Sequence, residues 1–184
     1  MQIAFTRVVG DYLALHGESP DLLPELQEGE DSAVLTIERQ LRARLLPAAI
    51  EATLAVPPES LDTMKSASLA VTSNRAGYCE ARAPSDYLRI YSLRMADWRE
   101  PVWRPEEPGS LRHCLGANAP AWMVCPERPM VIEERDHEGV LFKLYATAEP
   151  DIPARLRYIP LPVFDGEFLI ISQSAYCRLL CKCL

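Results

Sequence analysis

The sequence lacks the patterns that mark several large classes of protein. No apolar run reaches the roughly 18 residues that a membrane-spanning helix needs. The first residues also lack the charged and apolar regions of a signal peptide. A Gly-x-Gly-x-x-Gly pattern, a phosphate-binding loop and a Gly-x-Ser-x-Gly elbow are all missing. We therefore expect no membrane partner, no secretion and no cofactor.

Glycine is scarce as well, with eight glycines against sixteen prolines in 184 residues. Average proteins contain more glycine than proline, so the connections here should be stiff and extended. Hydrophobic residues make up 48% of the chain, which is typical of a folded protein. The length suits one domain, or one domain with an arm.

Basic residues are outnumbered by acidic ones, 19 to 26, which gives a formal charge of −7. Such a chain should be soluble, and its overall field should not attract nucleic acid. Arg89, Arg94, Arg99 and Arg104 could form a local basic patch, although a solvated strand face with scattered arginines explains them as well.

Six cysteines form an even set, which is compatible with disulfides. Without a secretory signal, buried free thiols are the better expectation. Cys177, Cys181 and Cys183 crowd the last residues, but their Cys-x3-Cys-x-Cys spacing matches zinc sites poorly. We expect no metal site.

Helical periodicity predicts three main helices. The first covers residues 4–16 and stops at Gly17, and a short turn or helix follows over 19–26. The longest runs from 31 or 32 to 55, should kink or split at Pro47, and ends at Pro57-Pro58. Its apolar face is expected to continue through Ile50 and Leu54. A closing helix is expected over 168–183.

Alternating apolar residues predict strands between these helices. Segments 67–73 and 78–83 should flank a hairpin loop, 87–95 should form a third strand, and 130–135 with 140–147 should form the best hairpin. Segment 155–162 should be an edge strand because Pro153, Pro160 and Pro162 surround it. Residues 101–120 read as irregular. The expected class is α+β: N-terminal helices (1–58), then a mainly antiparallel β core with a closing C-terminal helix (59–184), all in one structural unit.

Catalytic constellations are weak. His113-Cys114 could pair as base and nucleophile, but neighbours in an extended segment point to opposite sides. Glu106-Glu107 and Glu133-Glu134 are adjacent only in sequence, and solvated surface charge is the default for such pairs. We expect no catalytic residue and no enzymatic activity.

The most informative segment, 84–102, reads PSDYLRIYSLRMADWREPV. Pro84, Ser85 and Asp86 have turn chemistry, and the strand that follows places alternate residues on opposite faces. Tyr87, Arg89, Tyr91, Leu93 and Met95 are expected to share one face. An aromatic and basic tail follows, and Trp103-Arg104 extends it.

This segment resembles the head-to-tail adaptor, or tail-tube, proteins that dock under the portal of short-tailed bacteriophages. Those proteins often carry a proline, an acidic residue, an aromatic-Leu-Arg triplet, a strand, then a Trp and a Pro-Val. The matching positions here are Pro84, Asp86, Tyr87, Leu88, Arg89, Trp98, Pro101 and Val102. The likeness is sharpest over about twenty residues and extends loosely to the order of helices and strands.

The resemblance implies a structural virion protein at the head-tail junction, present in the host cytoplasm during assembly. Its partners would be about twelve copies of itself in a ring, the portal protein and downstream tail proteins. DNA would pass through the channel without specific binding, which an acidic surface would favour.

Interfaces are enriched in Trp, Tyr and Arg, so a set of such side chains in and after this segment forms the candidate partner interface. The set is Tyr87, Arg89, Trp98, Arg99, Trp103 and Arg104. Closing the β core is an equally good role for the tryptophans, Trp122 included. If Trp98 and Trp103 are anchors, alanine at either should impair docking and leave the isolated fold largely intact.

Two other functions stay open. The chain could be a cytosolic β-rich module that binds a peptide or a carbohydrate, which an aromatic-lined pocket would favour. It could also be an enzyme that uses Cys114 or a carboxylate pair, which loss of activity on alkylation would favour.

Overall fold

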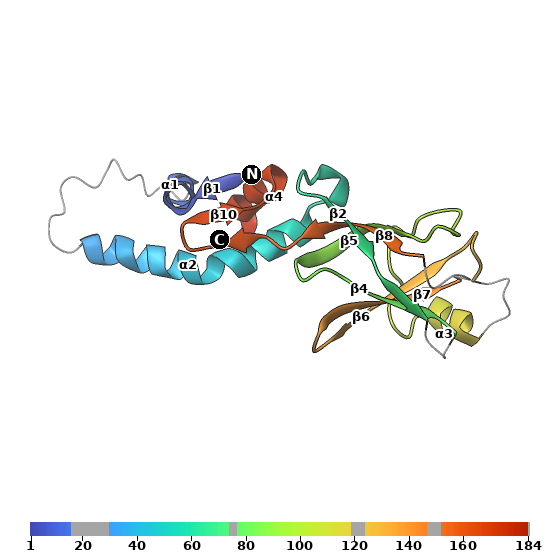
Figure 1. Ribbon diagram of the computed structural model, residues 1–184. Coiled ribbons are helices and arrows are strands. Elements are labelled where there is room, and N and C mark those ends of the chain that lie inside the picture. Colours follow the sequence, from blue (N-terminus) through green and yellow to red (C-terminus); the bar gives the residue numbers. More distant parts are fainter. Residues whose placement is uncertain (16–29, 74–76, 119–123, 147–151, 184) are drawn as a thin grey trace. The chain divides into compact units, whose positions relative to one another are not determined.

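The computed structural model describes residues 1–15, 30–73, 77–118, 124–146 and 152–183 (Figure 1). The class is α+β, as predicted, with helices toward both ends and a mainly antiparallel β core. The chain divides into two compact units: unit 1 is Met1–Thr63 with Leu161–Leu184, and unit 2 is Met64–Pro160. The expected short helix at 19–26 and Trp122 lie outside the described residues.

Unit 1 combines helices with a small sheet that joins its two chain segments. Strand β1 (Gln2–Ala4) pairs antiparallel with β10 (Phe168–Ile170), which also pairs with β9 (Val163–Phe164). Helix α1 (Phe5–Leu15) follows β1 directly, and buries Phe5, Val8, Val9 and Leu13. The first helix is thus confirmed, and the strand before it is an addition to the sequence prediction.

Helix α2 (Glu30–Ala55) runs as one helix through Pro47, so the expected split does not occur. Pro47 lies on the exposed side, where the carbonyl group of Ala43 that loses its helical donor can accept from water. The apolar face beyond Pro47 differs from the prediction, since Leu54 is 45% exposed while Ala49 and Ala52 are fully buried. A 3-10 turn, η2 (Pro58–Ser60), follows.

The predicted closing helix over 168–183 is wrong in its first part. Residues 168–170 form strand β10. Ser172 caps helix α4 (Gln173–Arg178), because its Oγ accepts from the Ala175 N–H at 3.1 Å. A π-helical segment, η3 (Leu179–Cys183), follows. The serine could not be placed as a cap from periodicity alone, because Leu169 and Ser172 also fit a helical spacing. These residues belong to unit 1.

Unit 2 contains two antiparallel sheets. One has the order β2 (Lys65–Leu69), β8 (Ala154–Pro160), β5 (Tyr87–Arg94). The other has the order β3 (Val71–Ser73), β4 (Cys79–Arg82), β7 (Gly139–Tyr145), β6 (Met130–Asp136). Both sheets contribute to one core, in which Leu93, Trp98, Phe142, Leu144 and Leu156 are almost fully buried.

The two hairpins of the second sheet were predicted correctly. β6 and β7 pair from Met130–Tyr145 to Asp136–Gly139, and β3 pairs with β4. The expected strand 67–73 is interrupted at Ala70, so that β2 and β3 enter different sheets. Helix α3 (Leu111–Asn118) lies within 101–120, which the sequence had suggested was irregular.

Strand β8 is central, which corrects the expectation of an edge strand. It pairs with β2 on one side and with β5 on the other. Pro153 precedes the strand and Pro160 is its last residue, so neither removes a hydrogen bond from the interior of the ladder.

The cysteines also differ from expectation. Of the five cysteines whose side chains are described, only Cys79 is buried, while Cys114, Cys177 and Cys181 are exposed. Among the described residues, no helix combines the length and apolar character needed to cross a membrane.

Candidate interaction surface

Strand β5 carries the first part of the informative segment, and it has buried residues on both faces. Register shifts between Tyr87 and Arg89 and between Ile90 and Ser92 interrupt the simple alternation. A bulge places one extra residue on its strand and re-aims the side chains that follow. The predicted single apolar face is therefore replaced by buried side chains on both sides, Tyr87 and Leu88 among them.

Tyr87 is 5% exposed and lies against Phe142 edge to face, with ring centroids 5.4 Å apart. Its hydroxyl donates to Oε2 of Glu133 at 2.8 Å. Burial, then the neighbouring carboxylate, raises the pKa of Tyr87. In this structure Tyr87 links β5 to β6 and has little surface to offer a partner.

Trp98 is also a core residue, with 1% of its surface exposed. It closes a turn after β5, in which its N–H donates to the carbonyl oxygen of Met95 at 3.3 Å. Its indole Nε1 donates to the carbonyl oxygen of Ala146 at 3.0 Å. Of the two roles left open for this tryptophan, the geometry fits closure of the β core.

Trp103 is different, because 57% of its surface is exposed. The chain turns back after Trp98, and Val102 exchanges two backbone hydrogen bonds with Leu93, both at 2.8 Å. This return brings Trp103 edge-on to Tyr91, with ring centroids 5.5 Å apart at 80°. Tyr91 also supports the guanidinium group of Arg157, 4.8 Å from its ring centroid.

Three arginines lie on the solvent side of the same sheet. Arg155 and Arg157 alternate with buried residues along β8, and Arg94 of β5 is the register partner of Arg155. We call the set of Arg94, Arg155, Arg157, Tyr91 and Trp103 the arginine face. Within the described part of the chain, none of the ion pairs includes these three arginines.

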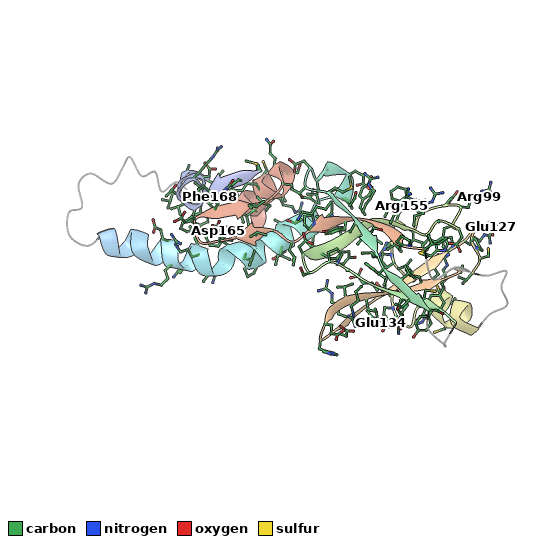
Figure 2. All side chains as sticks on the ribbon, in the orientation of Figure 1. Arg99, Glu127, Glu134, Arg155, Asp165 and Phe168 are labelled. Atoms are coloured by element: carbon green, nitrogen blue, oxygen red, sulfur yellow. The ribbon has the colours of Figure 1, made fainter. Side chains whose placement is uncertain are left out.

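The remaining predicted residues are three arginines outside the set called the arginine face. Arg89 is half-buried on β5, and Arg104 is exposed directly after Trp103. Arg99 lies near Glu127 (Figure 2). The pKa of Glu127 is lowered by its own backbone N–H, by the Cys125 thiol and by the charge of Arg99. The positive charge of Arg99 is thus partly balanced locally.

Asp86, in the turn before β5, braces the three-stranded sheet. One of its carboxylate oxygens accepts from the Tyr158 hydroxyl at 2.8 Å and the other from Lys65 Nζ at 2.7 Å. Burial alone would raise the pKa of Asp86, but the hydrogen bonds from Lys65 and Tyr158 outweigh it and lower that pKa. The acidic position of the motif therefore has a structural role.

The catalytic candidates are engaged in local contacts. His113 and Cys114 lie on helix α3, where His113 Nδ1 accepts from the Gly109 N–H at 2.8 Å. Glu106 pairs with Arg112 at 2.9 Å. Glu134 pairs with Lys143 at 2.7 Å, while Glu133 accepts from Tyr87.

Sequence reasoning passed over Arg155, Arg157 and Tyr91 as site residues. The signal for the first two was present, because Arg-x-Arg in a strand places both side chains on one face. Their pairing with β5, which lies much earlier in the chain, cannot be recognised from neighbouring residues. Comparison with protein-family models and with curated proteins gives no match for this chain.

Proposed function

We propose that this chain is a structural subunit of a phage particle, of the head-to-tail adaptor kind, and that the arginine face contacts a neighbouring protein. The observation that carries the proposal is the 57% exposed Trp103, which lies edge-on to Tyr91 at the end of the segment that resembles those adaptors. A half-exposed indole flanked by tyrosine and arginine has the composition of an interface hot spot.

The distribution of charge supports the same role. Unit 1 contains 13 acidic and 6 basic residues, whereas unit 2 contains 13 of each, so the whole net charge of −7 belongs to unit 1. A surface of this sign repels phosphate, which suits a channel that DNA crosses without binding. The neutral unit 2 carries the arginine face for protein contacts.

The adaptor role is tested by quantitative mass spectrometry of purified particles from a phage that encodes this chain. Copy numbers near that of the portal protein are expected, since a ring below the portal needs a comparable number of subunits. Absence of the chain from the particles would refute the proposal.

The contact itself is tested with Trp103→Ala in the phage. We expect incorporation into particles to fall at least about tenfold, because a hot-spot aromatic is worth about 2 kcal/mol or more. Leu111→Ala is the matched control, since Leu111 is an apolar residue of the same unit with 76% exposure. Equal incorporation of both variants would show that Trp103 is not an anchor.

A further inference from the structure

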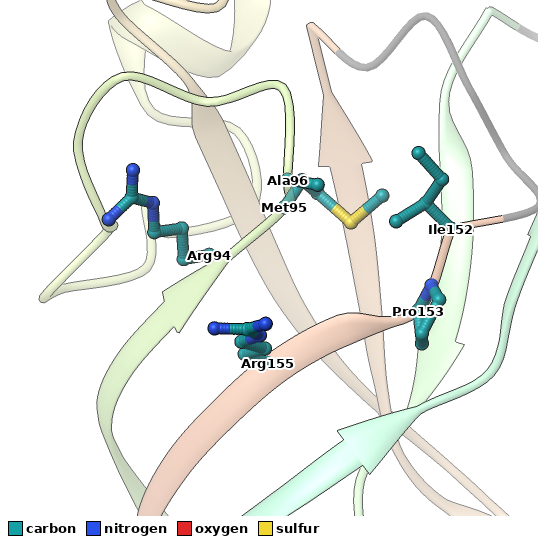
Figure 3. Close-up of a pocket in the computed structure, with 6 residues that line it drawn as sticks. All are labelled: Arg94, Met95, Ala96, Ile152, Pro153 and Arg155. Carbon is teal, nitrogen blue, oxygen red and sulfur yellow. The ribbon is translucent and has the colours of Figure 1, made fainter.

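At the end of the arginine face there is a pocket of about 340 Å³, lined by Arg94, Met95, Ala96, Ile152, Pro153 and Arg155 (Figure 3). This volume lies near the lower end of the ~300–1,000 Å³ that is usual for ligand pockets. The site therefore suits one or two amino-acid side chains rather than a large cofactor.

The two charged residues of the pocket are direct cross-strand neighbours. Arg94 and Arg155 are register partners in the β5–β8 pair, and such neighbours have Cβ atoms about 4.5–5.5 Å apart. Figure 3 shows both side chains extending to the same side of the pocket. Like charges in this position repel one another, so the pair costs stability unless an anion lies between them.

One of the two guanidinium groups is held in place by the fold. Arg94 Nε donates to the carbonyl oxygen of Trp98 at 3.3 Å, and Trp98 is itself fixed in the core. Among the ion pairs of the described residues, none supplies a carboxylate to Arg94 or Arg155. The pair is thus positioned to bind an anion from outside the described chain.

The opposite side of the pocket is apolar. Met95 and Ile152 extend toward one another, with Pro153 and Ala96 beside them (Figure 3). A carboxylate joined to an aliphatic group would match both halves, because arginine binds carboxylate through paired N–H donors and the apolar wall removes the aliphatic part from water. A sugar-phosphate has no apolar part to place against that wall.

We propose that this pocket binds an acidic side chain, Asp or Glu next to an aliphatic residue, on a peptide segment of a partner protein. The inference names the partner chemistry for the arginine face and so rests on the proposed function. It is tested on the isolated full-length chain, so that its failure is separate from failure of the particle experiments.

The probe is the dipeptide acetyl-Glu-Ile-amide, and its isosteric control is acetyl-Gln-Ile-amide. Binding is followed by NMR at the Arg94 and Arg155 side-chain N–H groups and at the backbone of Met95 and Ile152. We expect the Glu peptide to bind about tenfold more tightly than the Gln peptide, because a charged acceptor strengthens the hydrogen bonds. Equal affinities, or no shift at the pocket residues, would overturn the proposal.

Variants separate the binding role from a structural one. Arg94→Gln and Arg155→Gln should each weaken the Glu peptide about tenfold, while Arg135→Gln, an exposed arginine of the other sheet, should leave its affinity unchanged. Arg155→Gln should also keep or raise the melting temperature, since it removes a like-charge pair. A marked fall in melting temperature would show that Arg155 supports the fold instead.

Two further probes distinguish the source of the anion. If hexanoate binds as tightly as the Glu peptide, the ligand would be a free aliphatic acid, and the peptide assignment would be overturned. If inorganic phosphate displaces the Glu peptide at a phosphate concentration below that of the peptide, the peptide assignment would be overturned in favour of a phosphate ligand.

Discussion

The indole Nε1 of Trp98 donates to the carbonyl oxygen of Ala146, 48 residues later in the chain, at 3.0 Å. Ala146 directly follows β7 and has a φ of 68°, a left-handed conformation that is unusual for a residue other than glycine. The turn after β5 is thereby tied to the end of a strand in the other sheet of unit 2. Substitution of either residue should change the stability of the fold.

Trp98→Ala should destabilise the fold itself rather than docking alone. Removing a buried tryptophan leaves a cavity, and such changes cost about 3–5 kcal/mol. Urea unfolding of the purified chain measures this loss, with Trp103→Ala as the control that changes stability by less than about 0.5 kcal/mol. A small effect of Trp98→Ala would mean that the side chain is not packed as described.

Ala146→Gly should stabilise the chain by up to about 1 kcal/mol, because glycine adopts the left-handed conformation without the steric cost of a Cβ. The gain is limited by the greater entropy of glycine in the unfolded chain. Thermal unfolding of the variant measures the balance. A lower melting temperature would indicate that the strain is absent or that the methyl group of Ala146 has a packing role.

Stability should fall in acid because of Asp136. Its carboxylate accepts a bidentate contact from Arg82 at 2.9 and 3.0 Å. The hydrogen bond from Arg82 and that from the Glu138 N–H lower the pKa of Asp136 to about 2. At pH values above the ordinary aspartate pKa near 4, the lowered pKa of Asp136 stabilises the folded state. This contribution is lost as the pH falls from about 4 to about 2.

Denaturant unfolding at several pH values checks this expectation. Asp136→Asn should show a smaller loss of stability between pH 4 and pH 2 than the unmodified chain, because it has no proton to take up at this position. The same slope in both proteins would contradict the assignment of the acid transition to Asp136.

Tyr158 should ionise late in base. Burial, then its hydrogen bond to Asp86, raises the pKa of Tyr158 from 10 to about 12. The stabilising contribution is complete below pH 10 and disappears as the pH rises through 12. In Asp86→Asn the pKa of Tyr158 should fall but stay above 10, since burial remains.

NMR of chains with labelled tyrosine follows this titration residue by residue, and Tyr158→Phe assigns the signal. A Tyr158 pKa that does not move in Asp86→Asn would show that burial alone sets its value.

Local pattern was enough for the elements that depend on neighbours in sequence. Helices α1 and α2 have a helical spacing of apolar residues, and the β6–β7 hairpin has a glycine at its turn, where Gly139 has a φ of 120°. The α+β class followed from the order of these elements. Helix α3 was missed because the prolines and glycines around it dominate the composition of 101–120.

Elements whose form depends on distant partners could not be predicted in the same way. Residues 168–170 become a strand because β1, at the other end of the sequence, pairs with them. β8 is central because both β2 and β5 pair with it, and no local signal names either strand.

The candidate site shows the same division. Trp98 and Trp103 stand in similar sequence surroundings, each followed by arginine, yet one is 1% and the other 57% exposed. The difference arises from the turn at Met95 and the return of Val102 to Leu93, which is a matter of tertiary structure.

Unit 1 is discontinuous in sequence, whereas unit 2 is one uninterrupted segment of the chain. During translation, unit 2 can fold as soon as its last strand leaves the ribosome. The β1–β10 pair can form only later, after residues 168–170 have been synthesised. An already folded unit 2 holds its own ends in fixed positions, which lowers the entropy cost of closing the long loop between β1 and β10. Trp98→Ala, which weakens the core of unit 2, should therefore also delay the assembly of unit 1, although Trp98 is not part of unit 1.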